Sequence, residues 1–261
     1  MVAADRIPLT EEQVRNARRG YYGAISLVDD HVGAILGTLD EHGLADETIV
    51  IVTSDHGDML GERGLWYKMA PFEDSIRVPL LVHAPWKLAP RRVDDPVSHL
   101  DLLPTLVGLA GGPDEDAPTG LDGIDLTAAL EGDRVLMRDL PLEYLAEGVR
   151  APQVTLVRGP LKLVRDEGTD RVYDLEADPG EREPLPDDDR TDSLVQAADA
   201  RWDLERLDAA VRASQQARRL VARALATGTL TSWDHPTLEP DGPYIRSGQD
   251  FWSRLERARR V

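Results

Sequence analysis

The feature that most constrains the fold is a long helical pattern followed at once by a short apolar strand. Apolar side chains recur at helical spacing between residues 10 and 42, and the β-branched run TIVIVTS occupies residues 48–54. Thr10 and Gln13 fit a capping box, and Gly43 fits the position just after the helix. A helix that leads into a strand buried on both faces is typical of a parallel sheet with crossover helices. The sequence therefore predicts an α/β fold.

The rest of the chain divides into further expected elements. A second buried strand is predicted in RVPLLVHAP (77–85), a helix at 99–111, several short strands between 142 and 175, and a second long helix at 191–227. Short strands bounded by Gly, Pro and Asp favour a small antiparallel sheet. We expect residues 1–135 to be an incomplete part of a larger α/β domain. Residues 136–230 would form the small antiparallel sheet and long helix, and the aromatic tail 231–261 an oligomer contact.

Composition limits the classes of partner and chemistry. The chain has 30 Lys and Arg against 48 Asp and Glu, a net charge of −18, which disfavours nucleic acid and anionic membranes as partners. It has no cysteine, which excludes disulfides, thiolate zinc sites and a cysteine nucleophile from these residues. No long apolar stretch and no signal-peptide pattern occur, so we expect a cytoplasmic location. The start enters a helix with no preceding strand, as if inside a larger domain.

Asp55, His56 and Gly57 follow the first predicted strand directly. In open α/β sheets, ligand-binding groups gather beyond the carboxyl ends of the strands. A carboxylate oxygen and an imidazole nitrogen could supply two ligands of a divalent cation, and mixed ligation suits Mn²⁺ better than Ca²⁺. The same pair could instead cap the next turn, and Lys68 could be a surface lysine extending past Trp66. The residues alone leave these alternatives open.

The stretch VTSDHGDMLGERGLWYKM, continued by RVPLLVHAP, resembles the C-terminal metal loop of type I sulfatases in the alkaline-phosphatase superfamily. EYLAEG, VRASQQARRLVARALATG with SWD, and YIRSGQDFWSRLERAR are similar, in the same order, to the choline sulfatase branch. The resemblance covers nearly the whole chain. It implies a sulfuric ester hydrolase and the C-terminal part of an alkaline-phosphatase-like mixed sheet flanked by helices, followed by a small antiparallel sheet and a C-terminal helix.

The resemblance also implies roles for residues of the loop. Asp55 and His56 match the family's second pair of metal ligands. The Asp-His version is similar to the choline sulfatase and phosphonate hydrolase branch, which suits Mn²⁺, whereas Asp-Asn members bind Ca²⁺. Lys68 matches the lysine that bridges the formylglycine oxygen and a sulfate oxygen. A fixed ammonium there would stabilise negative charge on the transferring sulfuryl group.

Three further residues are candidates for substrate binding by the same resemblance. Glu143 falls in a region implicated in holding the choline head group, where a carboxylate can pair with a quaternary ammonium. Glu147 is close enough in sequence that the two are not distinguished. Asp250 is the candidate for a contact that closes the pocket of a neighbouring subunit. The tail departs from the branch at SWDHPT and GQDF, which leaves the ester open.

The family's nucleophile is missing from these residues. No Cys-x-Pro-x-Arg or Ser-x-Pro-x-Arg motif occurs, and no early Asp-Asp metal pair. We therefore expect the C-terminal portion of a sulfatase, inactive alone, with formylglycine in an N-terminal half and a small sulfate ester, choline sulfate among the candidates, as substrate. It would act as a homo-oligomer or with a complementing N-terminal half. The alternatives are a phosphonate or phosphate ester hydrolase of the same superfamily, or a non-catalytic, oligomerising remnant.

Overall fold

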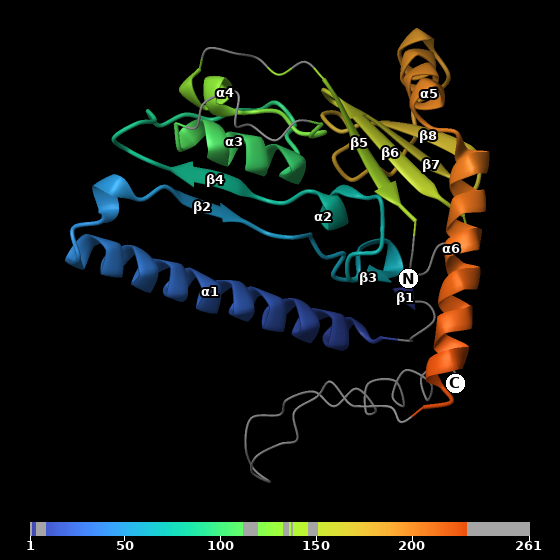
Figure 1. Cartoon of the computed structure of the whole chain (residues 1–261), viewed down its shortest axis with the longest axis horizontal. Helices are drawn as coiled ribbons and strands as arrows, with labels where there is room; N and C mark the ends of the chain where they lie inside the picture. The colour runs from blue at the N-terminus through green and yellow to red at the C-terminus, as the bar shows by residue number, and fades with distance from the viewer. Residues whose placement is uncertain are drawn as a thin grey trace. The chain divides into compact units, whose positions relative to one another are not determined.

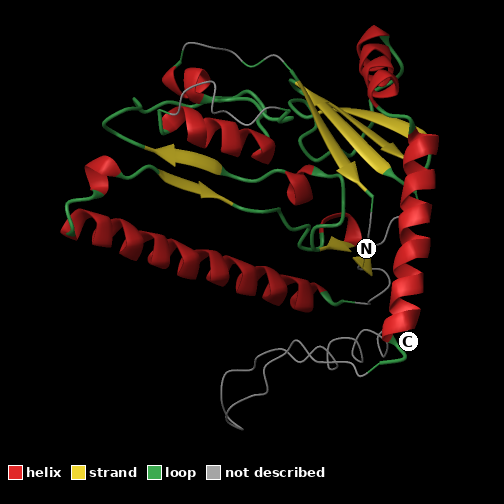
Figure 2. Ribbon diagram, viewed as in Figure 1, coloured by secondary structure: helices red, strands yellow, loops and turns green. Residues whose placement is uncertain are grey.

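The computed structural model describes residues 2–3, 9–111, 120–132, 136, 138–145 and 151–228 (Figure 1). The chain divides into two compact units, Met1–Leu207 and Asp208–Val261. The α-helices are α1 (Glu11–Glu41), α2 (Glu73–Ile76), α3 (Leu102–Leu109), α4 (Thr127–Glu131), α5 (Asp189–Arg201) and α6 (Leu204–Leu225), with 3₁₀ turns η2 (Ala45–Glu47), η3 (Glu62–Gly64) and η4 (His99–Asp101). The strands, yellow in Figure 2, are β1 (Val2–Ala3), β2 (Val50–Thr53), β3 (Leu65–Trp66), β4 (Leu80–His83), β5 (Asp139–Tyr144), β6 (Gln153–Arg158), β7 (Leu161–Asp166) and β8 (Thr169–Asp174).

The predicted first helix is confirmed as α1, together with both of its signals. The Thr10 hydroxyl accepts a hydrogen bond from the Gln13 amide at 3.2 Å, and the Gln13 side chain accepts one from the Thr10 amide at 2.8 Å. Gly43 follows the helix at a φ of 65°, which a glycine adopts without strain. Described along its whole length, α1 buries none of its side chains. Its outward apolar residues include Tyr22, Ile25, Leu27, Val28 and Ile35.

The predicted parallel sheet is wrong for the described strands. β2 and β4 pair antiparallel, with Val50 opposite His83 and Thr53 opposite Leu80. The direction reverses because the chain returns through a long loop instead of a crossover helix: α1 precedes β2 and does not link it to β4. Neither strand is buried on both faces, since the exposure of β4 alternates and Leu81 is 58% exposed. In Figure 1 the pair lies between α1 and the segment of α3 and α4.

The predicted small antiparallel sheet is confirmed as the meander β5-β6-β7-β8. Side chains alternate between its two faces. One face, including Val154, Leu156 and Leu163, packs against α5 to form a closed apolar core. The other face carries Lys162, which is fully buried. The sheet is therefore covered on both sides where β7 crosses it.

The predicted helix at 191–227 is two helices. Trp202 adopts an extended backbone (φ −121°, ψ 123°) and ends α5, and α6 begins at Leu204. The indole packs into the sheet core, and that burial fixes the break. Asp188 caps α5 by accepting hydrogen bonds from the amides of Arg190 and Thr191. Within the described ranges, no helix combines the length and the apolar character needed to cross a membrane.

Candidate functional site

The turn that follows β2 presents Asp55 and His56 to solvent. The Asp55 side chain is 82% exposed and that of His56 is 37% exposed. His56 Nδ1 lies 2.8 Å from the Gly57 carbonyl oxygen, and because a carbonyl can only accept, Nδ1 carries the proton in this contact. The lone pair of the neutral ring is then on Nε2, which lies 3.4 Å from Asp55 Oδ2. The turn thus displays an oxygen and a nitrogen donor side by side.

This pair of atoms fits half of a cation site. A separation of 3.4 Å between Oδ2 and Nε2 is that of two neighbouring ligands around an ion with bonds of about 2.1–2.4 Å. Metal-binding histidines commonly donate their other ring N–H to a carbonyl, which orients the ring, and the Nδ1 contact with Gly57 is of this kind. In the part of the chain that the structure describes, no group of three or more Asp, Glu or His side chains could hold an ion. A complete site therefore needs ligands from elsewhere.

Gly57 is needed for a reason that the sequence did not show. A Cβ at this position would collide with the carbonyl oxygen of Asp74 in α2. The Gly57 amide donates to the Ser75 carbonyl at 2.8 Å. The Asp-His turn therefore lies directly against the backbone of α2, and only glycine permits that approach.

The loop between Gly57 and α2 carries Lys68. Asp58 Oδ1 accepts from the amides of Leu60 and Tyr67, both at 3.1 Å, and the Met59 amide donates to the Tyr67 carbonyl at 2.9 Å. Met59 itself is fully buried and anchors the loop.

The Lys68 carbonyl accepts from the Ala70 amide at 2.9 Å and from the Ser75 hydroxyl. The side chain of Lys68 is exposed, and among the described residues no acceptor is recorded for its ammonium group. The structure thus ties both predicted elements, the Asp-His turn and the lysine turn, to the single residue Ser75.

The substrate-binding candidates have mixed outcomes. Glu143 lies on β5, and its Oε1 accepts a hydrogen bond from the Trp202 indole nitrogen at 2.7 Å. One carboxylate oxygen is therefore occupied by an indole donor that was not anticipated. Glu147 and Asp250 lie outside the described residues.

Sequence reasoning missed several side chains around the loop. Thr53, at the end of β2, contacts His99 Nε2 through its hydroxyl at 3.3 Å, which brings a second imidazole to the edge of the site. On the other side, Lys162 from β7 pairs with Glu73 of α2 and with Glu181. A lysine inside the apolar strand LKLVRD was the available signal, since a charge there needs a buried partner.

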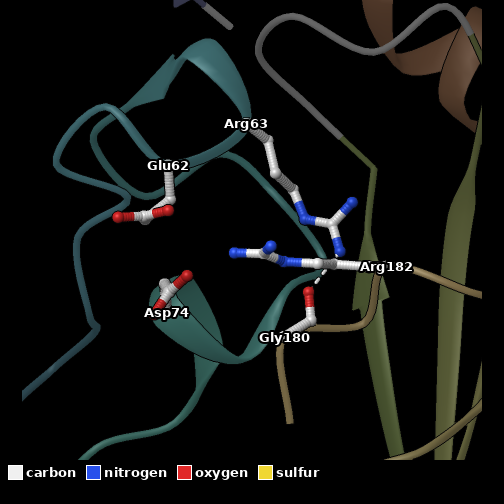
Figure 3. Close-up of a pocket in the computed structure, with 5 residues that line it drawn as sticks. All are labelled: Glu62, Arg63, Asp74, Gly180 and Arg182. Carbon is white, nitrogen blue, oxygen red and sulfur yellow. Dashed lines mark hydrogen bonds between the residues drawn. The ribbon is translucent and has the colours of Figure 1, made fainter. Parts of the chain in front are cut away.

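A hollow of about 360 Å³ opens beside α2 (Figure 3). Its lining residues come from the 62–63 turn, from α2 and from the 180–182 loop: Glu62, Arg63, Asp74, Gly180 and Arg182. Two guanidinium groups face two carboxylates, so the lining has no net charge that would select an anion or a cation. The hollow lies where the 62–63 turn and α2 meet the loop that follows β8, and we assign no ligand to it.

Three family models match the chain. The sulfatase model matches residues 3–112, the model of the N-sulphoglucosamine sulphohydrolase C-terminal region residues 61–208, and the model of the choline sulfatase C terminus residues 209–261. A choline-sulfatase of Rhizobium meliloti (strain 1021) is 40% identical over 263 residues, covering 97% of this chain and 50% of that protein. The chain thus spans about half the length of this relative.

Solved structures show the same fold. A 2-O GAG sulfatase is 25% identical with a TM-score of 0.62, over 80% of this chain and 46% of that one. The phosphonate monoester hydrolase of Agrobacterium radiobacter is 27% identical with a TM-score of 0.58, over 91% of this chain and 46% of that one. The fold is alkaline-phosphatase-like, as the resemblance implied, with helices and antiparallel sheets in the described part.

Proposed function

Because the chain belongs to the sulfatase family, we propose that it supplies the C-terminal portion of a sulfuric ester hydrolase whose nucleophile is not among these 261 residues. The observation that carries the proposal is the pair Asp55 Oδ2 and His56 Nε2, 3.4 Å apart, on the same loop as Lys68. An oxygen donor, a nitrogen donor and a free ammonium are among the groups that can hold a metal ion and a sulfate ester together. Formylglycine is expected in the complementing segment.

Each residue of the loop has a proposed part in the reaction. Asp55 and His56 would hold a divalent cation, Mn²⁺ or Ca²⁺, and when bound the ion would supply positive charge that polarises the ester. The His56 Nδ1 proton, donated to the Gly57 carbonyl, keeps the ring oriented with Nε2 outward. The Lys68 ammonium would donate hydrogen bonds to a sulfate oxygen as negative charge develops there.

Choline sulfate is the proposed substrate, supported by the match over 97% of this chain to a choline-sulfatase. The free carboxylate oxygen of Glu143, or that of Glu147, would face the quaternary ammonium, and Asp250 would close the pocket of a neighbouring subunit. The competing candidate is a phosphonate ester, favoured by the likeness to a phosphonate monoester hydrolase over 91% of this chain. These residues alone do not decide between the two esters.

The exposed face of α1 supports the proposal of a complementing partner. Tyr22, Ile25, Leu27, Val28 and Ile35 are all more than half exposed, which is a large apolar area for one helix. We propose that an N-terminal half of the sulfatase covers this face and supplies the remaining metal ligands. We likewise keep the division into 1–135, 136–230 and 231–261, with the tail as an oligomer contact, as part of the proposal.

Complementation tests the function directly. The purified chain would be mixed with the separately produced N-terminal portion of the Rhizobium meliloti choline-sulfatase, carrying formylglycine, and given Mn²⁺ and choline sulfate or phenyl phosphonate ester. We expect sulfate release only from the mixture, with a loss of about 10²-fold or more in Lys68→Ala and in Asp55→Ala. Faster release from the phosphonate would select the second candidate. A stable complex that turns over neither ester would support the non-catalytic remnant instead.

A further inference from the structure

Helix α2 has only four residues, yet it forms hydrogen bonds with both the turn that follows Asp55 and His56 and the turn that carries Lys68. We propose that α2 acts as a clamp that fixes the Asp-His turn relative to the Lys68 turn, and that buried Lys162 anchors this clamp to the antiparallel sheet. Ser75, Glu73 and Lys162 are thereby positioning residues. The inference rests on the proposed function in one respect, since it takes Asp55, His56 and Lys68 as the groups that need positioning.

Ser75 of α2, which is 2% exposed, makes the contacts with both turns. Its carbonyl accepts from the Gly57 amide at 2.8 Å, and its hydroxyl donates to the Lys68 carbonyl. The backbone of one residue thus holds the turn with Asp55 and His56, and its side chain holds the turn with Lys68. The two functional turns cannot move apart without breaking one of these bonds.

The outer anchor is a buried cluster of charges. Lys162 Nζ lies 2.9 Å from Glu73 Oε1 and 2.7 Å from Glu181 Oε1, and the lysine side chain is fully buried. The contact with Glu181 is an ion pair rather than an aligned hydrogen bond. Glu181 Oε2 in turn accepts from the Glu73 amide, at the first residue of α2, at 2.7 Å. Lys162 therefore binds the side chain of Glu73, and Glu181 binds its backbone amide, at the start of the helix.

A second connection joins the loop to the same region. Arg63 donates to the Gly180 carbonyl oxygen (Figure 3) and to that of Glu181. Its guanidinium lies 3.9 Å from the ring centre of Phe72, the residue before α2. The loop and α2 thus meet the 180–181 segment at two separate points. Such double attachment restricts rotation as well as translation of α2.

Burying this cluster has a purpose that stability alone does not supply. Taking a lysine and two glutamates out of water is unfavourable, and their mutual attraction offsets this only in good geometry. An apolar contact between β7 and α2 would avoid the desolvation of charged groups, but it would not fix the direction of α2. Directed ion pairs do fix it, and a misplacement of about 1 Å in a catalytic group can cost about 10²-fold in rate.

Amide hydrogen exchange in the intact chain tests the clamp without any turnover. In Ser75→Ala, the exchange of Ala70, whose amide donates to the Lys68 carbonyl, should be faster by about fivefold or more, while that of Gly57 stays unchanged because its acceptor is a backbone carbonyl. In Lys162→Met and Glu73→Ala, both amides should exchange faster. Glu73→Gln should recover part of the protection, because its carbonyl oxygen can still accept from Lys162.

Thr105→Val is the matched control. Its hydroxyl is also buried and bonds to backbone, but its recorded partners are the Asp101 carbonyl and the Leu126 amide, at 3.0 Å from the latter, and neither belongs to α2. It should accelerate exchange at Leu126 and leave Gly57 and Ala70 unchanged.

Equal acceleration of all amides in Ser75→Ala, or none at Ala70, would overturn the clamp. If Lys162→Met does not fold, the Ser75→Ala and Glu73→Gln variants still decide. Because exchange is independent of catalysis, a failed complementation assay would leave the clamp standing, and the reverse also holds.

Discussion

The antiparallel sheet and the α1 region use apolar residues in opposite ways. In the sheet, Val154, Leu156 and Leu163 are almost wholly buried against α5 and form a closed core. In α1, Leu27, Val28 and Ile35 are more than half exposed, although their spacing is just as regular. Regular apolar spacing therefore shows which face of an element is able to pack, and it does not show that the described residues provide the partner.

The candidate site lies at the boundary between these two regions. β2 and the Asp-His turn belong to the open region, whereas Lys162 belongs to the covered sheet and Glu181 to the loop that follows β8. The site would thus take its rigidity from one side and its remaining ligands from the other. Four substitutions or pairs of substitutions would break or sharpen this difference.

The largest difference is expected from the same substitution made in both regions. Leu163→Ala, at a fully buried position of β7, should lower the free energy of unfolding by about 2–5 kcal/mol, because it leaves a cavity in a closed core. Leu27→Ala, 57% exposed on α1, should change it by less than about 0.5 kcal/mol. Urea unfolding followed by far-ultraviolet circular dichroism measures both. Equal losses would show that α1 is packed in solution.

Replacing glycine by alanine should have effects of opposite sign on stability in the two regions. Gly57→Ala forces a methyl group into the Asp74 carbonyl and should destabilise the chain by about 1–3 kcal/mol. Gly33→Ala lies in the middle of α1 with no neighbour within 4 Å, and should stabilise the helix by about 0.5–1 kcal/mol. Thermal unfolding of the two variants gives the comparison. Stabilisation by Gly57→Ala would refute the close approach between the Asp-His turn and α2.

Acid should weaken the sheet edge. The side-chain hydrogen bonds from Arg158 lower the pKa of Asp139 below its usual value, against a smaller opposing effect of burial. A lowered carboxyl pKa gives stability that is present above the unfolded pKa, about 3.9, and is lost as the pH falls through the folded value. Because the pair is partly exposed and screened, Asp139→Asn should cost about 0.5–1 kcal/mol at pH 7. That cost should vanish in unfolding curves recorded near pH 2; a constant difference would contradict it.

The smallest effect on stability is expected on the open face of α1. Ile25→Glu combined with Ile35→Glu should leave the free energy of unfolding within about 0.5 kcal/mol, since both positions are exposed. The same double variant should lose binding of a hydrophobic dye and should fail to complement the N-terminal half. Val221→Glu, exposed on α6, is the control for added charge alone. Unchanged complementation would remove α1 from the proposed interface.

Local structure was largely predictable because it depends on residues close together in the chain. The capping box of Thr10 and Gln13 and the glycine after α1 were correct, as was the antiparallel meander, since hydrogen bonds, backbone strain and period-two alternation act within a few residues. The break at Trp202 was missed because the indole is held by the sheet core, which no local pattern reveals. The prediction of parallel strands was wrong for a similar reason, because burial does not encode which way a neighbouring strand runs.

The sequence by itself determined the family, the loop with Asp55, His56 and Lys68, and the absence of a cysteine nucleophile from these residues. Only the tertiary structure decided how that loop is held. The contacts of Ser75 with Gly57 and Lys68, and of Lys162 with Glu73 and Glu181, join residues far apart in the chain. The desolvation of a buried charge is offset only where folding brings its partners within about 3 Å, and the linear sequence does not reveal that distance.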